Sequence, residues 1–214
     1  MNPDLQRTHG GEIRVDLLLI ADMIEPGARI LDVGCGDGAL LRHLARAKEV
    51  DGRGIELSQA GVNACVAQGL SVVQGDADTD LVNYPADSFD YVVLSQTLQM
   101  VRRPRDVIDQ LLRIGRKCVI SIPNFGHWKV RWKLGMTGRM PVTEVLDRQW
   151  YDTPNAHFCT IKDFVLLCRD LEIRIERRIS VDKQGRRMNI VNDGPFANLF
   201  AEQGVFVLSR QGND

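Results

Sequence analysis

Long hydrophobic runs are missing from this chain of 214 residues. The longest apolar run, Leu17–Ala21, is far shorter than the roughly 20 residues that a membrane-spanning helix needs. The first residues, Met1–Leu5, are polar and lack the apolar stretch of a signal peptide. The five cysteines are scattered and form no Cys-x-x-Cys pair, which favours free thiols over a disulfide framework or a zinc cluster. The sequence therefore predicts a soluble, cytoplasmic protein without a membrane partner.

An excess of charge of either sign is also missing, because 27 Lys and Arg offset 28 Asp and Glu. A protein that binds nucleic acid through bulk charge usually has a strong basic excess, so a nucleic-acid partner is not expected, although a local basic patch is compatible with this balance. Hydrophobic residues make up 44% and charged residues 26%, which is ordinary globular composition. The length and composition predict a single domain over residues 1–214.

Short apolar runs alternate with helical patterns along the chain. The runs predict seven strands, at residues 28–33, 52–57, 70–74, 89–95, 117–122, 173–181 and 205–209. Between them, leucines and isoleucines recur at helical spacing, Ser58 and Pro104 stand at helix starts, and Thr160 with Asp163 forms a capping box. Strand and helix in this rhythm predict an α/β fold in which helices cover both faces of a mostly parallel sheet.

Two stretches interrupt this rhythm. Residues 123–159 are too many for a plain connection in a compact α/β unit, so we expect them to form an inserted cap over the active face. Residues 183–203 separate the last two strands and read as irregular.

The sharpest local motif is Leu31-Asp-Val-Gly-Cys-Gly-Asp-Gly38, directly after the first strand and before a helix. Glycines let the main chain turn tightly and let a ligand approach closely. The spacing of Gly34, Gly36 and Gly38 differs from the dinucleotide fingerprint, and the Gly-Lys-Ser/Thr end of a phosphate-binding loop is missing. The loop is therefore a ligand site or a tight strand-to-helix turn.

Acidic residues at later strand ends favour the ligand site. Glu56 ends the second strand about twenty residues past the loop, where a carboxylate can accept both hydroxyls of a ribose. Asp76 follows the third strand and could accept from the exocyclic amine of adenine. Asp32 precedes the turn, where it can orient the loop or face the ammonium of a ligand. These acids should converge outside the carboxyl ends of neighbouring strands.

The loop and the acids together resemble the first three motifs of class I S-adenosylmethionine-dependent methyltransferases. The resemblance implies a single-domain Rossmann-like fold with a seven-stranded, mostly parallel sheet whose last strand is antiparallel. It implies that Gly34, Gly36 and Gly38, with Cys35 between them, lie against the methionine part of S-adenosylmethionine or S-adenosylhomocysteine. Glu56 would take the ribose and Asp76 with Ala77 the adenine. The remaining residues that it assigns to this site are Asp32, Ser95 and Gln96.

Signals for a methyl acceptor are weak. The Asn/Asp-Pro-Pro-Tyr/Phe motif of many nucleobase amino-methyltransferases is replaced by Ser95–Gln99. Methyl transfer depends mainly on positioning and needs no base, so the catalytic residues stay open. His127, Tyr151 and His157 are candidate bases, although a lone loop histidine is more often structural. No further ligand completes a metal site with His157 and Cys159, so none is expected.

The insertion combines aromatic and basic residues. Trp128 and Trp132 are interleaved with four Lys and Arg in the segment from His127 to Arg139, a pattern that can bind single-stranded nucleic acid. The two tryptophans are four residues apart and would share one face of a helix. A lid helix over the cleft or a docking surface for a protein partner is the favoured interpretation.

Five phrases carry a closer resemblance, and three of them lie in the insertion. They are Leu31–Gly38, Ser95–Pro104, Ile122–Trp128, Gly138–Val142 and Trp150–His157. Together they resemble the MetW family of bacterial methionine-biosynthesis proteins. This resemblance implies a role beside homoserine O-acyltransferase, which activates homoserine. Two functions stay open: a regulatory subunit that binds S-adenosylmethionine and activates this partner, or a methyltransferase acting on a small acceptor. Whether the chain is an enzyme is therefore open at this point.

Overall fold

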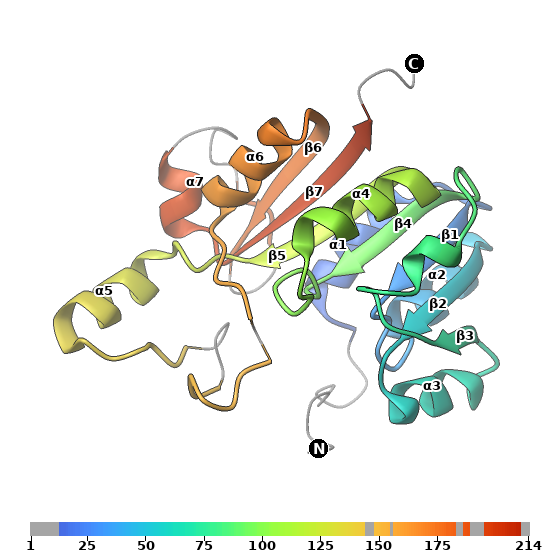
Figure 1. Cartoon of the computed structure of the whole chain (residues 1–214), viewed down its shortest axis with the longest axis horizontal. Coiled ribbons are helices and arrows are strands. Elements are labelled where there is room, and N and C mark those ends of the chain that lie inside the picture. The colour runs from blue at the N-terminus through green and yellow to red at the C-terminus, as the bar shows by residue number, and fades with distance from the viewer. Residues whose placement is uncertain (1–12, 144–147, 155, 183–185, 189–194, 211–214) are drawn as a thin grey trace. The chain divides into compact units, whose positions relative to one another are not determined.

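The computed structural model describes residues 13–143, 148–154, 156–182, 186–188 and 195–210 (Figure 1). The chain divides into two compact units, one of residues 1–95 and 103–119 and the other of residues 96–102 and 120–214. Strand β5 (Gly115–Pro123) contributes to both units. Part of the predicted cap (residues 144–147 and 155) and the polar amino terminus lie outside the described residues.

The first unit alternates helices and strands. Its elements are α1 (Val15–Met23), β1 (Arg29–Val33), α2 (Ala39–Lys48), β2 (Asp51–Glu56), α3 (Gln59–Val66), β3 (Ser71–Gln74), the 3-10 turn η2 (Leu81–Asn83), β4 (Phe89–Ser95) and α4 (Pro104–Ile114). The second unit holds α5 (Trp128–Thr137), α6 (Ile161–Asp170), β6 (Ile173–Val181), α7 (Pro195–Phe200) and β7 (Gln203–Arg210).

The sheet is seven-stranded and has the order β3-β2-β1-β4-β5-β7-β6. Strand β1 pairs in parallel with β2 and β4, and β2 pairs in parallel with β3. Four consecutive residues of β1, Ile30 to Val33, are buried, although successive side chains of a strand point to opposite faces. Both faces of β1 are therefore covered, as in a parallel sheet between layers of helices. The predicted fold class is confirmed.

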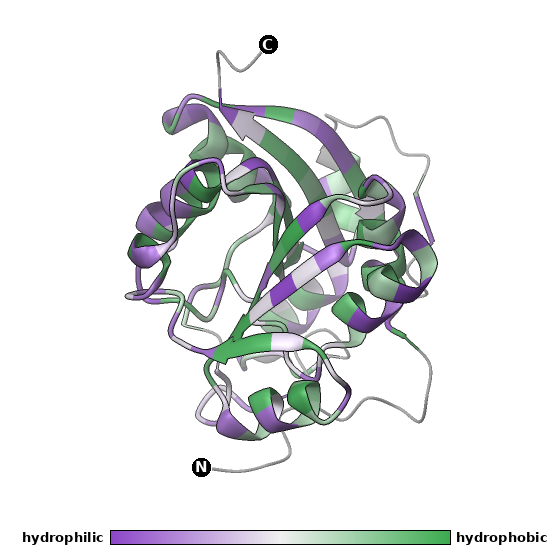
Figure 2. Ribbon diagram, turned by 90° about the vertical axis from the view of Figure 1, so that its right-hand side faces the viewer, coloured by the Kyte–Doolittle hydropathy of each residue, from purple (hydrophilic) through white to green (hydrophobic). Residues whose placement is uncertain are grey.

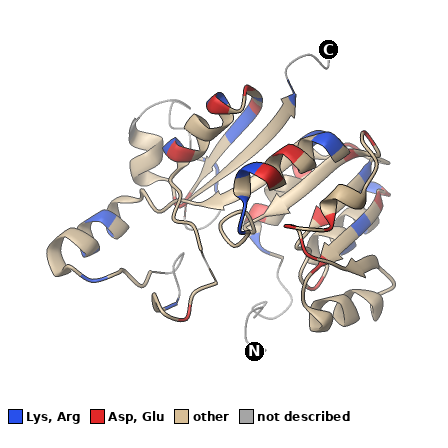
Figure 3. Ribbon diagram, viewed as in Figure 1, with Lys and Arg blue, Asp and Glu red and all other residues tan. Residues whose placement is uncertain are grey.

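The helices of the first unit bury one face and expose the other (Figure 2). On α2, Leu40, Leu41 and Leu44 are buried, whereas Arg46 is exposed. Helix α4 begins at Pro104, whose fixed φ and missing N–H suit a first helical position. Its charged residues lie on the outer side, away from the core (Figure 3).

In the second unit, β6 and β7 pair antiparallel, as the resemblance implies for the last strand. Phe164 of α6 packs against Phe206 of β7, with ring centroids 4.6 Å apart. The predicted capping box is present, because the Thr160 side chain accepts from the Asp163 main chain and the Asp163 carboxylate accepts from Thr160. This box fixes the start of α6, whose buried side packs against β7.

Two sequence expectations need correction. Ser58 occupies the N-cap position of α3, but its hydroxyl makes no capping hydrogen bond; its main-chain N–H donates to the Glu56 carboxylate at 2.8 Å. Residues 183–203, expected to be irregular, contain helix α7. Within the part of the chain that the structure describes, no helix is long and apolar enough to cross a membrane.

Candidate functional site

The predicted site residues of the first unit lie at the carboxyl ends of its parallel strands. Glu56 ends β2, Ser95 ends β4, Asp32 is the next-to-last residue of β1, and Asp76 follows β3 by two residues. Because β3, β2, β1 and β4 are neighbours in that order, these side chains share one edge of the sheet. This edge is where open α/β sheets bind their ligands.

The glycine loop joins β1 to α2 in a conformation that requires glycine. The φ angles of Gly34, Gly36 and Gly38 are 72°, 59° and 77°, in the left-handed region that side chains rarely adopt. A Cβ at Gly38 would lie 2.4 Å from Leu70 Cδ1, so this position is also closed by packing. The loop is anchored by the Gly34 N–H, which donates to the Ile55 carbonyl at 2.8 Å.

Helix α3 packs against the glycine loop through Gly61 and Cys65. A Cβ at Gly61 would lie 2.8 Å from both the Gly36 carbonyl oxygen and Cγ of Glu56. The Cys65 thiol donates to the same Gly36 carbonyl at 3.4 Å. Burial is the largest cause that raises the pKa of Cys35 and of Cys65, so both thiols stay protonated and Cys35 is a packing residue of the loop, not a nucleophile. Sequence reasoning missed Gly61, because a single glycine in a helix carries no signal for what lies against it.

Glu56 holds the loop with both carboxylate oxygens. Its Oε2 accepts from the Gly36 N–H at 2.9 Å, and its Oε1 accepts from the Ser58 N–H at 2.8 Å. The side chain is buried. Each carboxylate oxygen has a second lone pair, so Glu56 can still accept from two ligand hydroxyls while it fixes the loop.

Asp32 is a buried acid beside this loop, with 3% of its surface exposed. Within the described residues, its carboxyl makes no hydrogen bond and no ion pair. Burial is the main cause that raises the pKa of Asp32 to about 7; the Arg14 charge lowers it and the Glu56 charge raises it. A cationic ligand group would stabilise the ionised carboxylate here.

A cluster that sequence reasoning missed lies near Asp32. The Arg14 guanidinium donates to both oxygens of the buried Asp16 carboxylate, at 3.1 and 2.8 Å, and to the Ser95 hydroxyl at 2.8 Å. Arg14 and Ser95 are 81 positions apart along the chain, so no local sequence motif indicates that they meet. The cluster fixes the Ser95 hydroxyl at the end of β4.

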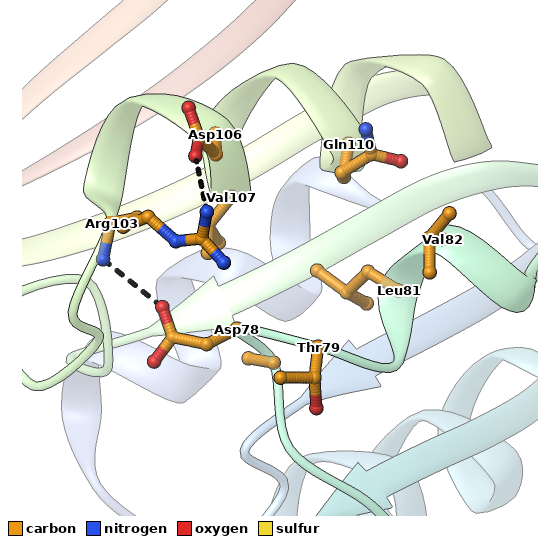
Figure 4. A pocket seen from close by; sticks show the side chains of 9 residues that line it. Asp78, Thr79, Leu81, Val82, Arg103, Asp106, Val107 and Gln110 are labelled. Carbon is orange, nitrogen blue, oxygen red and sulfur yellow. Dashed lines mark hydrogen bonds and ion pairs between the residues drawn. The ribbon is translucent and has the colours of Figure 1, made fainter.

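Asp76 and Ala77 form a turn after β3. The Asp76 carboxylate accepts from the Asp78 N–H at 2.9 Å through its Oδ1. Ala77 lines a pocket of about 340 Å³ whose wall includes Asp106 of α4 and Arg103, the residue before this helix (Figure 4). The Arg103 N–H donates to Asp78 at 3.0 Å, which ties this turn to the start of α4.

Gln96 belongs to the second unit, unlike the other predicted site residues. Its φ is 50°, in the left-handed region, and its N–H donates to the carbonyl and hydroxyl oxygens of Ser121 at 3.0 and 3.1 Å. The assignment of Gln96 to the cofactor stays a prediction.

The chain matches a known protein family over most of its length. The sequence profile of the family described as methionine biosynthesis protein MetW matches residues 14–208. The chain belongs to the MetW family. The Bifunctional methionine biosynthesis protein MetXA/MetW of Rhodopirellula baltica is 32% identical over 209 residues, 93% of this chain and 33% of that protein.

Methyltransferases are similar as well. The Ubiquinone biosynthesis O-methyltransferase of Psychrobacter cryohalolentis is 30% identical over 176 residues, covering 76% of this chain and 65% of that protein. Among solved structures, a SAM-dependent methyltransferase from Archaeoglobus fulgidus has a TM-score of 0.63 at 15% identity and covers 91% of both chains, which shows the shared fold. The chain thus spans a third of the bifunctional relative and less than two thirds of this O-methyltransferase.

The MetW-like insertion contains a structural joint at Asn124. The side chain is 1% exposed, and its Nδ2 donates to the Asn198 and Ala201 carbonyls at 2.9 and 2.7 Å. Its Oδ1 accepts from the N–H groups of Gly126 and Ile161 at 2.9 and 3.3 Å. Asn124 therefore joins the start of the insertion to α6 and α7.

His127, a candidate base, uses its ring for structure. Its Nδ1 accepts from the Lys129 N–H at 3.3 Å at the start of α5, and the ring is hydrogen-bonded to the Phe200 main chain. Burial first and the Lys129 charge second lower the pKa of His127, so it is neutral. This supports the structural interpretation of His127.

The other two candidate bases are Tyr151 and His157. Tyr151 is 72% exposed, and the main-chain N–H of His157 donates to the Gln99 carbonyl at 3.0 Å. In the described residues, no three side chains are grouped to hold a metal ion.

Proposed function

We propose that the chain binds S-adenosylmethionine or S-adenosylhomocysteine at the carboxyl edge of β1, β2 and β3. The buried Asp32 carboxyl supports this, because it makes no hydrogen bond among the residues that the structure describes and would face the ammonium of the methionine part. Glu56 supports it as well, because both its oxygens keep a lone pair for the ribose hydroxyls. A ligand that carries an ammonium and a ribose fits these two acids at one sheet edge. When bound, S-adenosylmethionine would supply an electrophilic methyl group.

The proposed contacts follow the order of the strands. Asp32 takes the ammonium, the glycine loop lies against the methionine part, Glu56 takes the ribose, and the turn after β3 takes the adenine. The full proposed set is Asp32, Gly34, Cys35, Gly36, Gly38, Glu56, Asp76, Ala77, Ser95 and Gln96.

Titration calorimetry with S-adenosylmethionine and S-adenosylhomocysteine tests the site. Glu56→Ala removes charge-assisted hydrogen bonds worth about 1.5–3 kcal/mol each, so affinity should fall at least tenfold. Gly36→Val, which puts a branched side chain where φ is 59°, should abolish binding. The matched control is Asp170→Asn, which removes an exposed carboxylate at the end of α6 and should bind normally. Unchanged affinity in both folded site variants would refute the assignment.

We further propose that the chain acts in methionine biosynthesis as an activating or regulatory partner of homoserine O-acyltransferase. The observation that carries this is the relative whose name joins MetXA and MetW in one chain. This sequence covers only a third of that relative, which leaves room for a second module in the same chain. Fusion keeps two modules at a high effective concentration. Separate chains that act together need a docking surface to achieve the same result.

Coexpression tests this role. Acylation of homoserine should be higher when the acyltransferase is produced with this chain than when it is produced alone, and the two should elute together in size-exclusion chromatography. Equal activity with and without the chain, together with separate elution, would contradict the proposal.

An active methyltransferase is the second candidate, and the similarity to ubiquinone biosynthesis O-methyltransferase favours it. Incubation with S-adenosylmethionine labelled in its methyl group separates the two functions. A labelled small molecule formed from cell extract would support methyl transfer, whereas cofactor that binds without turnover would support the regulatory role.

A further inference from the structure

Helix α5 is a helix without a buried side. It has ten residues, and none of them is buried. Isolated helices of this length are marginal in water, and most helices in proteins are stabilised by packing of an apolar face. The sequence of α5 nevertheless contains two tryptophans, a leucine and a methionine. These apolar side chains are placed where they could pack against another molecule.

The helix is held by its ends and its polar residues. His127 caps the first turn, and Gly138 ends the helix with a φ of 62°. Arg131 Nε donates to the Gly126 carbonyl at 2.6 Å, and Lys133 Nζ donates to the Val142 carbonyl at 2.8 Å. Of its large apolar side chains, Trp128 contacts the His127 ring and the Lys129 ammonium, each at 5.9 Å from the indole centroid, and none is buried.

These side chains form a stripe. Trp128, Trp132 and Met136 are spaced four residues apart, which aligns them on one face of a helix, and they are 43%, 64% and 66% exposed. We call this the Trp–Met face. Aromatic residues and methionine are the types that protein interfaces concentrate at their centres.

Basic residues predominate beside the Trp–Met face, although Lys129 Nζ lies 3.8 Å from the Glu202 carboxylate. Lys129, Arg131 and Lys133 are the charged residues of α5, and the helix has no Asp or Glu (Figure 3). Bonds to carbonyl groups orient Arg131 and Lys133 without neutralising them. A surface that matches α5 must therefore be an apolar groove with carboxylates at its rim.

We propose that the Trp–Met face of α5 docks into an apolar, acid-rimmed groove on the homoserine acyltransferase. This inference rests on the proposed function, which supplies the partner through the fused relative. A protein is favoured over nucleic acid because the chain has no basic excess, with 27 Lys and Arg against 28 Asp and Glu. It is favoured over a membrane because Val130 and Leu134 lie on the side of α5 opposite the Trp–Met face, so the helix lacks the separate apolar and polar faces of a lipid-binding surface helix.

The test measures affinity of the purified chain for the purified acyltransferase. Trp132→Ala should weaken binding about 30-fold or more, as truncation of a central aromatic residue does. Phe196→Ala is the matched control, because Phe196 is an aromatic residue of the same unit with 61% exposure, and it should bind within twofold of the wild type. Because Trp132 is exposed, Trp132→Ala should unfold at the same urea concentration as the wild type. Added salt should slow association, since the rim contacts are charged.

The outcomes separate this inference from the proposed function. If the wild type binds and stimulates the acyltransferase and Trp132→Ala does so equally well, the docking face is wrong and the partner role stands. If the wild type neither binds nor stimulates, both proposals fail. Trp132-dependent sedimentation with phosphatidylglycerol vesicles, or Trp132-dependent self-association without the acyltransferase, would assign the face to another occupant and overturn the inference.

Discussion

Asp32→Asn should change the pH dependence of stability in a defined direction. Burial, the largest cause, raises the pKa of Asp32 from 3.8 to about 7. The folded chain therefore keeps a proton on Asp32 that the unfolded chain releases above pH 4. The stabilising contribution of this group is full below pH 4 and is lost as the pH rises to 7. Over that window the free energy of unfolding should fall by about 1.4 kcal/mol per pH unit from this group alone.

Urea denaturation of both proteins from pH 5 to pH 8 measures this effect. The asparagine amide does not titrate, so the wild type should lose about 2–3 kcal/mol relative to Asp32→Asn between these pH values. Most of the loss should occur below pH 7, with a plateau above it. Asp170→Asn, at an exposed position, should run parallel to the wild type. Parallel curves for Asp32→Asn as well would show that Asp32 titrates normally and would refute the reasoning.

Three further predictions follow from the same contacts. Affinity for S-adenosylmethionine should rise several-fold from pH 6 to 7.5 in the wild type and stay flat in Asp32→Asn, because an ammonium favours the ionised carboxyl; calorimetry checks it. Gly61→Ala should lower the free energy of unfolding in urea by about 1–3 kcal/mol, since its Cβ would meet Glu56 at 2.8 Å. Gly135→Ala on α5 has open space and should raise the free energy of unfolding by up to about 1 kcal/mol, so equal effects of the two variants would contradict this reasoning. Asn124→Ala should cost about 3 kcal/mol or more in the same assay, because it removes the hydrogen bonds of four main-chain groups, three of them buried. A cost below about 1 kcal/mol would show that these groups find new partners.

The parallel sheet and the glycine loop could be predicted from the sequence because their signals are local. Short apolar runs that end at glycines mark buried strands, and the capping box at Thr160 and Asp163 is read within four residues. The acids at the strand ends follow from the same rhythm, since the carboxyl ends of parallel strands share one edge.

The contacts behind these residues could not be predicted, because they join distant parts of the chain. Gly61 reads as a weak point in a helix until α3 is placed against the loop, and Arg14 reads as a surface charge until it reaches Ser95. The uncovered state of α5 is of the same kind. Two tryptophans four residues apart predict a shared face, but only the structure shows that no residue of this helix is buried.

Apart from Gln96, the proposed cofactor site lies in the first unit and the proposed docking face in the second, and thermodynamics still connects them if the regulatory proposal holds. If S-adenosylmethionine changes the affinity for the acyltransferase by some factor, the acyltransferase must change the affinity for S-adenosylmethionine by the same factor. Regulatory couplings usually amount to about 5- to 150-fold. Calorimetry should therefore give one coupling factor from two titrations, and Glu56→Ala should reduce the effect of added cofactor on docking without changing docking in its absence. A factor of one in both titrations would make the chain a docking partner that does not sense the cofactor. Unequal factors would show that one titration followed a process other than this complex.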